Sequence, residues 1–285
     1  MMQDKRDIWL ITNTASGSND APAIAAIEQA CGGCGLSIAH RSTFPEDPLP
    51  SQSDLTGAGI ELLAIFAGDG TVNAVLKAMD GWDGQVLVLP GGTMNLLFHR
   101  LFADLTLEQV LAAVCNGTAT TRRPGIIVSQ FGHGYAEVMA GPGTAWSGVR
   151  EALREFNLIA IASETGTALS ETVAGDMVAC IAPPFGRPEG YPLLMIEAGD
   201  SDLNLIAYYA ETTGKVLEQA AAMAARDFRR GPHEILGRAE EFTLVAPGGD
   251  GFGVLLDGEL ERASGRTRFS LARCGVDLLA TQTND

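Results

Sequence analysis

The chain has 285 residues, enough for two domains, and 46% of them are hydrophobic, so a packed core is expected. Its 19 basic and 35 acidic residues give a formal charge of −16, which argues against a nucleic-acid partner and against broad adsorption to anionic membranes. No apolar run reaches the roughly 18 residues that a membrane-spanning helix needs. The N-terminus leads into a strand rather than a signal-peptide core, so we expect a cytoplasmic protein.

The first part of the chain alternates strand and helix signals. Short apolar runs predict strands at Ile8–Ile11, Leu36–Arg41, Glu61–Phe66 and Val86–Leu89. Apolar residues at helical spacing predict helices at Pro22–Cys31, Thr71–Met79, Met94–Leu101 and Leu107–Cys115. The repeated order of strand, glycine-rich turn and helix predicts a parallel sheet with right-handed crossovers.

After about Thr121, glycine and proline turns separate short strand candidates, which is typical of a β-rich domain. The candidates are Ile126–Gln130, Tyr135–Ala140, Met177–Ala182, Leu193–Glu197, Leu203–Tyr209, Glu241–Ala246, Val254–Leu256 and Thr267–Leu271. Helices are expected at Trp146–Phe156 and Gly214–Arg226. We therefore predict an α/β domain over residues 1–123 and a β-rich domain over residues 124–274. The final segment, 275–285, is a candidate to return to the first domain.

A glycine-rich or polar turn follows three of the predicted strands. We call Asn13–Ser18 the first loop, Ala67–Asn73 the second loop and Pro90–Asn95 the third loop. Glycines at the carboxyl ends of parallel strands let backbone N–H groups approach phosphate oxygens, and the following helix adds its positive end. The loops therefore predict a phosphate-binding site. Neither G-x-G-x-x-G after the first strand nor G-x-x-x-x-G-K-[ST] is present, which excludes the common dinucleotide and P-loop motifs.

The loops resemble those of the diacylglycerol kinase catalytic-domain family, which includes bacterial lipid kinases and sphingosine and ceramide kinases. The resemblance is carried by Gly68-Asp-Gly-Thr71 with Asn73 and by Pro90-Gly-Gly-Thr93-Met-Asn95. Leu256-Asp-Gly-Glu259 matches the family's D-G-E element, and Asn13–Gly17 resembles its N-P-x-S-G turn. The resemblance implies a nucleotide-binding α/β domain followed by a β-sandwich-like lipid-substrate domain, with the active site between them.

The chain departs from the family pattern at four positions. Ala67 replaces the first glycine of G-G-D-G-T, and Thr14 replaces the proline of the opening turn. Leu96 stands where an acidic residue usually follows the asparagine of the third loop. Ser201 replaces glycine in the acidic D-G element that the family places before D-G-E.

The resemblance implies ATP as phosphoryl donor and Mg²⁺ as its metal. Asp69 is the expected magnesium-linked or phosphate-positioning carboxylate, with capping of the following helix as the alternative. Thr43 stands where the family has a nucleotide-contacting threonine, and its neighbours His40, Arg41 and Ser42 are alternatives. The implied nucleotide-binding residues are Asn13, Ser16, Thr43, Ala67, Gly68, Asp69, Gly70, Thr71, Val72, Asn73, Gly92, Thr93 and Asn95.

Glu259 is the general base that the resemblance implies, because a carboxylate can take the proton of an attacking lipid hydroxyl. Asp257 is expected to assist through a metal ion or by fixing Glu259. The alternative is a solvated hairpin turn, since Asp-Gly is a common hairpin sequence. Asp200 and Asp202 are the nearest match to the family's metal-binding element.

The implied acceptor is a membrane lipid such as diacylglycerol, reached by a peripheral contact at the inner face of the membrane. The basic cluster Arg226–Arg230 is a candidate for a phosphate or headgroup contact, with a solvated helix end as the alternative. The sequence leaves a homodimer open. Two other functions also stay open: an NAD kinase-like or phosphofructokinase-like enzyme, and a nucleotide- or lipid-binding regulatory module without turnover.

The five cysteines are odd in number and widely scattered, which does not indicate a disulfide framework. Cys31-Gly-Gly-Cys34 has the C-x-x-C spacing of zinc and redox sites, but no second pair or matching histidine pair completes a tetrahedral site. We expect two ordinary thiols, with a redox or metal-linked pair as the alternative.

Overall fold

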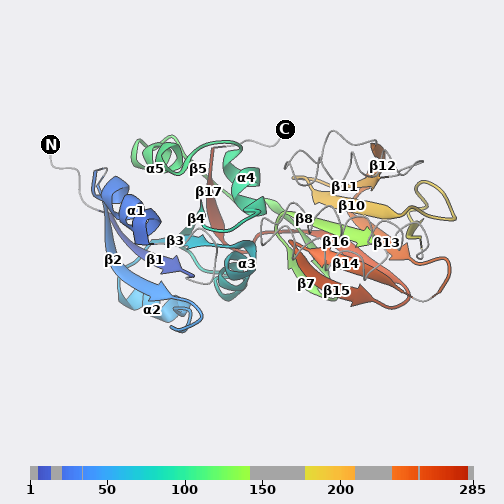
Figure 1. Cartoon of the computed structure of the whole chain (residues 1–285), viewed down its shortest axis with the longest axis horizontal. Helices are drawn as coiled ribbons and strands as arrows, with labels where there is room; N and C mark the ends of the chain where they lie inside the picture. The colour runs from blue at the N-terminus through green and yellow to red at the C-terminus, as the bar shows by residue number, and fades with distance from the viewer. Residues whose placement is uncertain are drawn as a thin grey trace. The chain divides into compact units, whose positions relative to one another are not determined.

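The computed structural model describes residues 6–13, 21–33, 35–141, 177–208, 233–249 and 251–281 (Figure 1). The chain divides into two compact units, one formed by Met1–Pro124 with Arg273–Asp285 and the other by Gly125–Ala272. Several predicted features lie outside the described residues: Ser16 with most of the first loop, Cys34, both helices expected at Trp146–Phe156 and Gly214–Arg226, and the basic cluster Arg226–Arg230.

The first unit contains a six-stranded sheet in the order β2-β1-β3-β4-β17-β5. Its strands are β1 (Arg6–Thr12), β2 (Leu36–Thr43), β3 (Leu62–Ala67), β4 (Gln85–Pro90), β5 (Thr120–Arg122) and β17 (Asp277–Ala280). β1 to β4 and β17 run parallel, and β5 is antiparallel to β17. Every residue of β3 is buried, as expected for a strand with both faces covered.

The described helices of this unit are α1 (Ala21–Gly33), α2 (Gln52–Gly57), α3 (Asp69–Ala78), α4 (Leu96–Phe102) and α5 (Leu107–Cys115). α5 begins at a capping box in which the Thr106 hydroxyl and the Gln109 side chain satisfy backbone N–H groups. α3 instead begins after Gly68, which provides no side-chain cap, and buries Val72 and Val75 toward the sheet. The second loop thus runs directly into α3, and no N-cap side chain caps the first turn of this helix.

The second unit consists of two antiparallel sheets. The six-stranded sheet has the order β12 (His233–Ala239), β11 (Leu203–Tyr208), β10 (Leu193–Ala198), β8 (Glu137–Gly141), β14 (Phe252–Leu256) and β15 (Glu259–Ala263). The five-stranded sheet has the order β7 (Gly132–Gly134), β6 (Gly125–Ser129), β16 (Thr267–Arg273), β13 (Glu241–Val245) and β9 (Ala179–Ala182). Side chains from both sheets, such as Leu194 of β10 and Phe242 of β13, share one buried core. The unit is a β-sandwich of the kind in which two inner faces interdigitate.

The predicted fold class, a parallel-sheet α/β domain followed by a β-sandwich-like domain, is confirmed. Elements that were not predicted are α2, β5, β7, β12 and β15. Among the described cysteines, Cys31, Cys180 and Cys274 are free and buried, whereas Cys115 is disulfide-bonded. None of the helices in the described ranges is long and apolar enough to cross a membrane.

Candidate functional site

The carboxyl ends of β1 to β4 lie at one edge of the first sheet, because these strands are parallel. Thr12 at the end of β1 is opposite Thr43 of β2, and Ala67 at the end of β3 is opposite Pro90 of β4. Asn13, the second loop and the third loop therefore begin at the same edge. This is the edge at which open α/β sheets bind their ligands.

The two glycines of the third loop let it pack directly against the second loop. A Cβ on Gly91 would lie 2.4 Å from the backbone nitrogen of Ala67. A Cβ on Gly92 would lie 2.5 Å from the Cα of Gly68. Both distances are far shorter than the optimal separation of about 3.5–4.0 Å between carbon atoms. Only glycine therefore fits at these positions without moving backbone.

Asn95 closes the third loop on itself. It is buried and has a φ of 52°, in the left-handed region that asparagine tolerates better than most residues. Its Oδ1 accepts the Gly92 N–H at 2.7 Å, and its Nδ2 donates to the Gly92 carbonyl at 2.9 Å. The Gly91 N–H donates to the Leu89 carbonyl at 3.0 Å. The sequence predicts that such N–H groups face phosphate, but the Gly92 N–H bonds within the loop and the Gly91 N–H bonds to Leu89 of β4. The two glycines instead allow close packing.

Asp69 and Asn13 tie the loops together. The Asp69 Oδ1 accepts the N–H of Leu96, the first residue of α4, at 2.8 Å. The Asn13 Nδ2 donates to the Thr71 Oγ1 at 2.8 Å. Asp69 thus satisfies a helix N-terminus, although it is that of α4 and not that of α3, which Asp69 itself opens. The Asp69 side chain connects the second loop to the third, and the Asn13 side chain connects the first loop to the second.

The other predicted residues of the two loops differ in what they can offer a ligand. Ala67 and Val72 are buried, so only their backbone atoms could reach a ligand. Gly70 is exposed in the first turn of α3, and Asn73 and Thr93 are partly exposed. The polar and backbone groups that can face a phosphate are therefore those of the first turn of α3 and the rim of the third loop.

Thr43 lies at the same edge, at the end of β2. Its N–H donates to the Asp47 Oδ2 at 2.7 Å, and its Oγ1 lies 3.5 Å from the hydroxyl of Thr12. The neighbouring Ser42 is buried, and its Oγ accepts the indole N–H of Trp9 at 3.0 Å. Thr43 is therefore better placed than Ser42 to meet a ligand.

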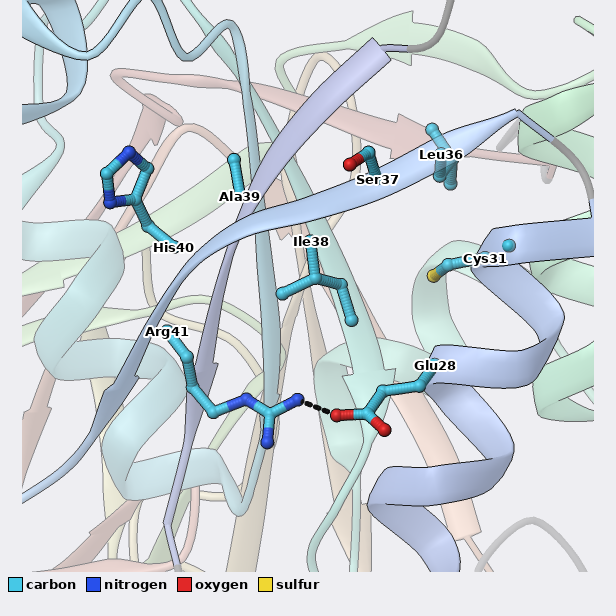
Figure 2. A pocket seen from close by; sticks show the side chains of 9 residues that line it. Glu28, Cys31, Leu36, Ser37, Ile38, Ala39, His40 and Arg41 are labelled. Atoms are coloured by element: carbon cyan, nitrogen blue, oxygen red, sulfur yellow. Dashed lines mark hydrogen bonds and ion pairs between the residues drawn. The ribbon is translucent and has the colours of Figure 1, made fainter.

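The other two neighbours of Thr43 line a separate pocket of about 410 Å³ between α1 and β2 (Figure 2). Arg41 forms an ion pair with Glu28 of α1, and His40 stacks on the Trp9 ring with centroids 4.5 Å apart. Cys31 also lines this pocket, and burial raises the pKa of its thiol to about 11. No residue of the second or third loop lines the pocket, so it is distinct from the loop edge.

The D-G-E element forms the hairpin turn between β14 and β15. Leu256 pairs with Glu259, and the two residues between them have positive φ values, 47° at Asp257 and 87° at Gly258. Positive φ at both central positions is the pattern of a type I′ hairpin. The element is therefore a hairpin turn, as the alternative prediction has it, but the turn is not fully solvated. Asp257 is buried, whereas Glu259, at the start of β15, is exposed.

Asp257 bonds three backbone N–H groups in the segment that leads into β8. Its Oδ2 accepts from Tyr135 at 2.6 Å, and its Oδ1 accepts from Ala136 and Glu137, each at 2.9 Å. The Asp257 N–H donates in turn to the Glu137 carbonyl at 3.1 Å. The turn is thus fastened to the neighbouring strand by four hydrogen bonds.

Asp200 and Asp202 lie in the turn between β10 and β11, where the Gly199 N–H donates to the Asp202 carbonyl at 2.8 Å. Glu197, just before this turn, pairs with Glu137, whose carbonyl accepts the Asp257 N–H. The two acidic turns therefore lie at the same end of the strands in the six-stranded sheet. No group of three or more His, Cys, Asp or Glu residues that could hold a metal occurs among the described residues.

Glu137 and Glu197 are acidic residues at this end of the sheet that were not predicted from the sequence. Neither belongs to a motif, and each is followed or preceded by apolar strand residues that read as core. Only the strand pairing places them beside the D-G-E turn. A single glutamate beside an apolar run in each strand was the one signal available in the sequence.

Residues 7–125 match the family model for the diacylglycerol kinase catalytic domain. Among solved structures, one of a Bacillus anthracis protein provisionally assigned as a diacylglycerol kinase superposes with a TM-score of 0.60 at 13% identity, covering 98% of this chain and 97% of that one. A second, described as a diacylglycerol kinase of the same organism, gives a TM-score of 0.59 at 12% identity, with 98% of each chain covered. At these identities the likeness establishes the fold alone. No curated protein matches the chain.

Proposed function

We propose, from the premise that residues 7–125 are a diacylglycerol kinase catalytic domain, that the chain is an ATP-dependent lipid kinase. It would transfer the γ-phosphoryl group of ATP to a lipid hydroxyl such as that of diacylglycerol. The observation that carries the proposal is the pair of glycine loops, held together at the carboxyl edge of the first sheet within the matched domain. In the sequence order of the family, the D-G-E turn follows in the second unit.

The first turn of α3 is the proposed phosphate site. Backbone N–H groups at a helix N-terminus bind anions, and here no N-cap side chain occupies them. The hydroxyls of Thr71 and Thr93 lie in the same two loops and would add hydrogen bonds. Asn13, which follows β1, and Thr43, which ends β2, would border the nucleotide on the other side of the sheet edge.

Asp69 is the residue that fits the implied Mg²⁺. Magnesium in kinases is held by one or two carboxylates together with phosphate oxygens and water, and a partly exposed carboxylate beside the phosphate site meets that need. When bound, the ion would neutralise charge on the transferred phosphoryl group. Asp69 would also keep the third loop in place through Leu96. We propose Asp200 and Asp202 only as a second, separate metal site.

Glu259 is the proposed general base. Its exposed carboxylate would accept the proton of the lipid hydroxyl as that oxygen attacks the γ-phosphorus and ADP leaves. Residues 124–274 would bind the lipid, and the chain would contact the inner face of the membrane peripherally, because its acceptor resides there.

The test uses the purified chain, radiolabelled ATP and a total lipid extract, with diacylglycerol, NAD and fructose 6-phosphate as separate acceptors. Glu259→Gln should lower lipid phosphorylation by about 10² to 10⁴, the usual contribution of a general base. Glu261→Gln is the matched control, because Glu261 is an exposed glutamate on the same strand. Wild-type turnover in Glu259→Gln would eliminate Glu259 as the base.

The choice of acceptors separates the competing functions. Labelling of NAD or fructose 6-phosphate in place of lipid would assign the chain to the other kinase classes. ATP binding without transfer to any acceptor would identify a nucleotide-binding module without turnover.

A further inference from the structure

We propose that Asp257 is a positioning residue, which fixes Glu259 by fastening the β14–β15 turn to β8 and does not bind a metal ion. The proposal rests on the proposed function, because it assigns Asp257 to the base of that reaction. It starts from the surroundings of the carboxylate. Asp257 is 4% exposed, and both of its oxygens accept backbone N–H groups of residues 135–137.

The environment of Asp257 favours a carboxylate and disfavours a cation. Three N–H dipoles point at the side chain, and hydrogen bonds from neutral donors to an ionised acceptor are strong. An ionised carboxylate offers about four lone-pair positions, and these backbone N–H groups take three of them. A divalent ion would have to compete with these donors and lie close to their positive ends.

The same hydrogen bonds explain why an aspartate suits this position. A φ of 47° is tolerated by Asp and Asn better than by most side chains. Asparagine would tolerate the same φ, but its side-chain NH₂ group would replace one carboxylate oxygen. That NH₂ group would then face backbone N–H groups, and both are donors. Aspartate alone combines the left-handed backbone with acceptors on both sides. The selection of this residue thus needs no metal.

The consequence for Glu259 follows from the register of the hairpin. Glu259 is the residue after Gly258 and pairs with Leu256, so its Cα position is set by the turn. The Asp257 N–H also donates to the Glu137 carbonyl, which fixes the turn from its backbone as well as its side chain. Asp257 thus holds the turn that sets the backbone position of the proposed base.

A double-mutant cycle tests the proposal on the purified full chain, with ATP and diacylglycerol in mixed micelles. Asp257→Asn should lower kcat by about 10- to 100-fold while the KM for ATP and the half-saturating Mg²⁺ concentration stay at wild-type values. In the Glu259→Gln background, Asp257→Asn should have no further effect, because it acts only through the residue already lost. Additive losses, or an Mg²⁺ requirement raised several-fold, would overturn the proposal.

Two further variants keep the test decisive. Gly258→Ala leaves the carboxylate intact and meets no atom within 4 Å, but it strains a residue with a φ of 87°. It should reproduce the kcat loss and the unchanged Mg²⁺ dependence, whereas a metal ligand at Asp257 would leave its kcat near wild type. Asp54→Asn is the matched control, because its carboxylate also accepts a backbone N–H, that of Ser51, but at α2.

Hydrogen exchange separates a failure of this proposal from a failure of the proposed function. A wild-type chain that phosphorylates no lipid refutes the kinase assignment. The fastening of the turn is then read directly: Asp257→Asn should speed exchange of the amides of residues 135–137 by at least tenfold. Unchanged exchange at these amides would overturn the anchoring role, whatever the activity.

Discussion

Replacing Gly91 with alanine should separate the second and third loops. The added methyl carbon would lie 2.4 Å from the Ala67 nitrogen and 2.6 Å from the Phe66 carbonyl carbon. Both atoms belong to the backbone of β3, a central strand with every residue buried, so neither can rotate away as a side chain could. The loop that carries Gly91 must move instead, and it takes the Asn95 closure with it.

The cost can be estimated from overpacked cores, where an added methyl group in a tight site destabilises by about 1–3 kcal/mol. A value near 2 kcal/mol would lower the Tm by about 6 °C for a unit of this size. The affinity for ATP should fall by at least tenfold, because the proposed phosphate site depends on how the two loops meet. The two losses should appear together.

Thermal unfolding followed by circular dichroism and ATP titration by calorimetry measure these losses. Gly57→Ala is the matched control, because Gly57 ends α2 and a Cβ there meets nothing within 4 Å. That variant should be as stable as the wild type or more stable by about 0.5–1 kcal/mol. If Gly91→Ala behaved like Gly57→Ala in both measurements, the close packing of the loops would not be what requires glycine.

Three more outcomes are expected. Asn95→Ala loses both hydrogen bonds to Gly92 and strains a left-handed residue, so urea unfolding should show a loss of about 2–3 kcal/mol, and a loss below about 0.5 kcal/mol would contradict the loop closure. Asp69→Asn keeps an acceptor for the Leu96 N–H and should match the wild-type Tm while losing phosphoryl transfer, whereas Asp69→Ala should lose both; full activity in Asp69→Asn would show that its charge is not used. Cys31, with a pKa raised by burial to about 11, should react slowly with a thiol reagent at pH 8 until the chain unfolds. Because the folded state holds that proton more tightly than the unfolded state, stability should fall as pH rises from about 9 to about 11, and rapid labelling of the native chain would refute the burial.

The sequence indicates most clearly the strands with a strong burial pattern. Residues 62–67 and 86–89 form uninterrupted apolar runs, and the structure buries all of them, in β3 and β4. The helices that follow were predicted from apolar residues at helical spacing, as in α3. A buried strand or helix has a pattern of apolar residues that can be recognised in the sequence without knowing which elements pack against it.

The elements that escaped prediction are short or lie at sheet edges. β12 and β15 are the two edge strands of the six-stranded sheet, and most of their residues are exposed or partly exposed. An edge strand has one solvated side, so its apolar alternation is weak. α2 has only six residues after its capping box, which is too short to show helical periodicity. Here the local sequence carried little of the information, and pairing with a distant strand decided the structure.

Motifs located the candidate site, but they did not predict what each residue bonds. The glycines of the third loop and the D-G-E turn were found as sequence patterns. That Asp69 bonds an amide 27 positions away, and Asp257 amides up to 122 positions away, depends on tertiary packing. A sequence pattern identifies residue types that suit a chemistry. The hydrogen-bond partners of a buried carboxylate depend instead on which backbone segment packs against it in the fold.

The position of β17 sets the order in which the first sheet can be completed. β17 lies between β4 and β5, although the whole second unit separates it from them along the chain. During synthesis, one edge of β4 therefore lacks its neighbour until β17, residues 277–280, has been made. A fragment ending at Pro124 would leave that edge open to pairing with other copies. To be produced alone, the first unit would need residues 273–281 grafted after Pro124, so that its sheet is completed within one continuous segment.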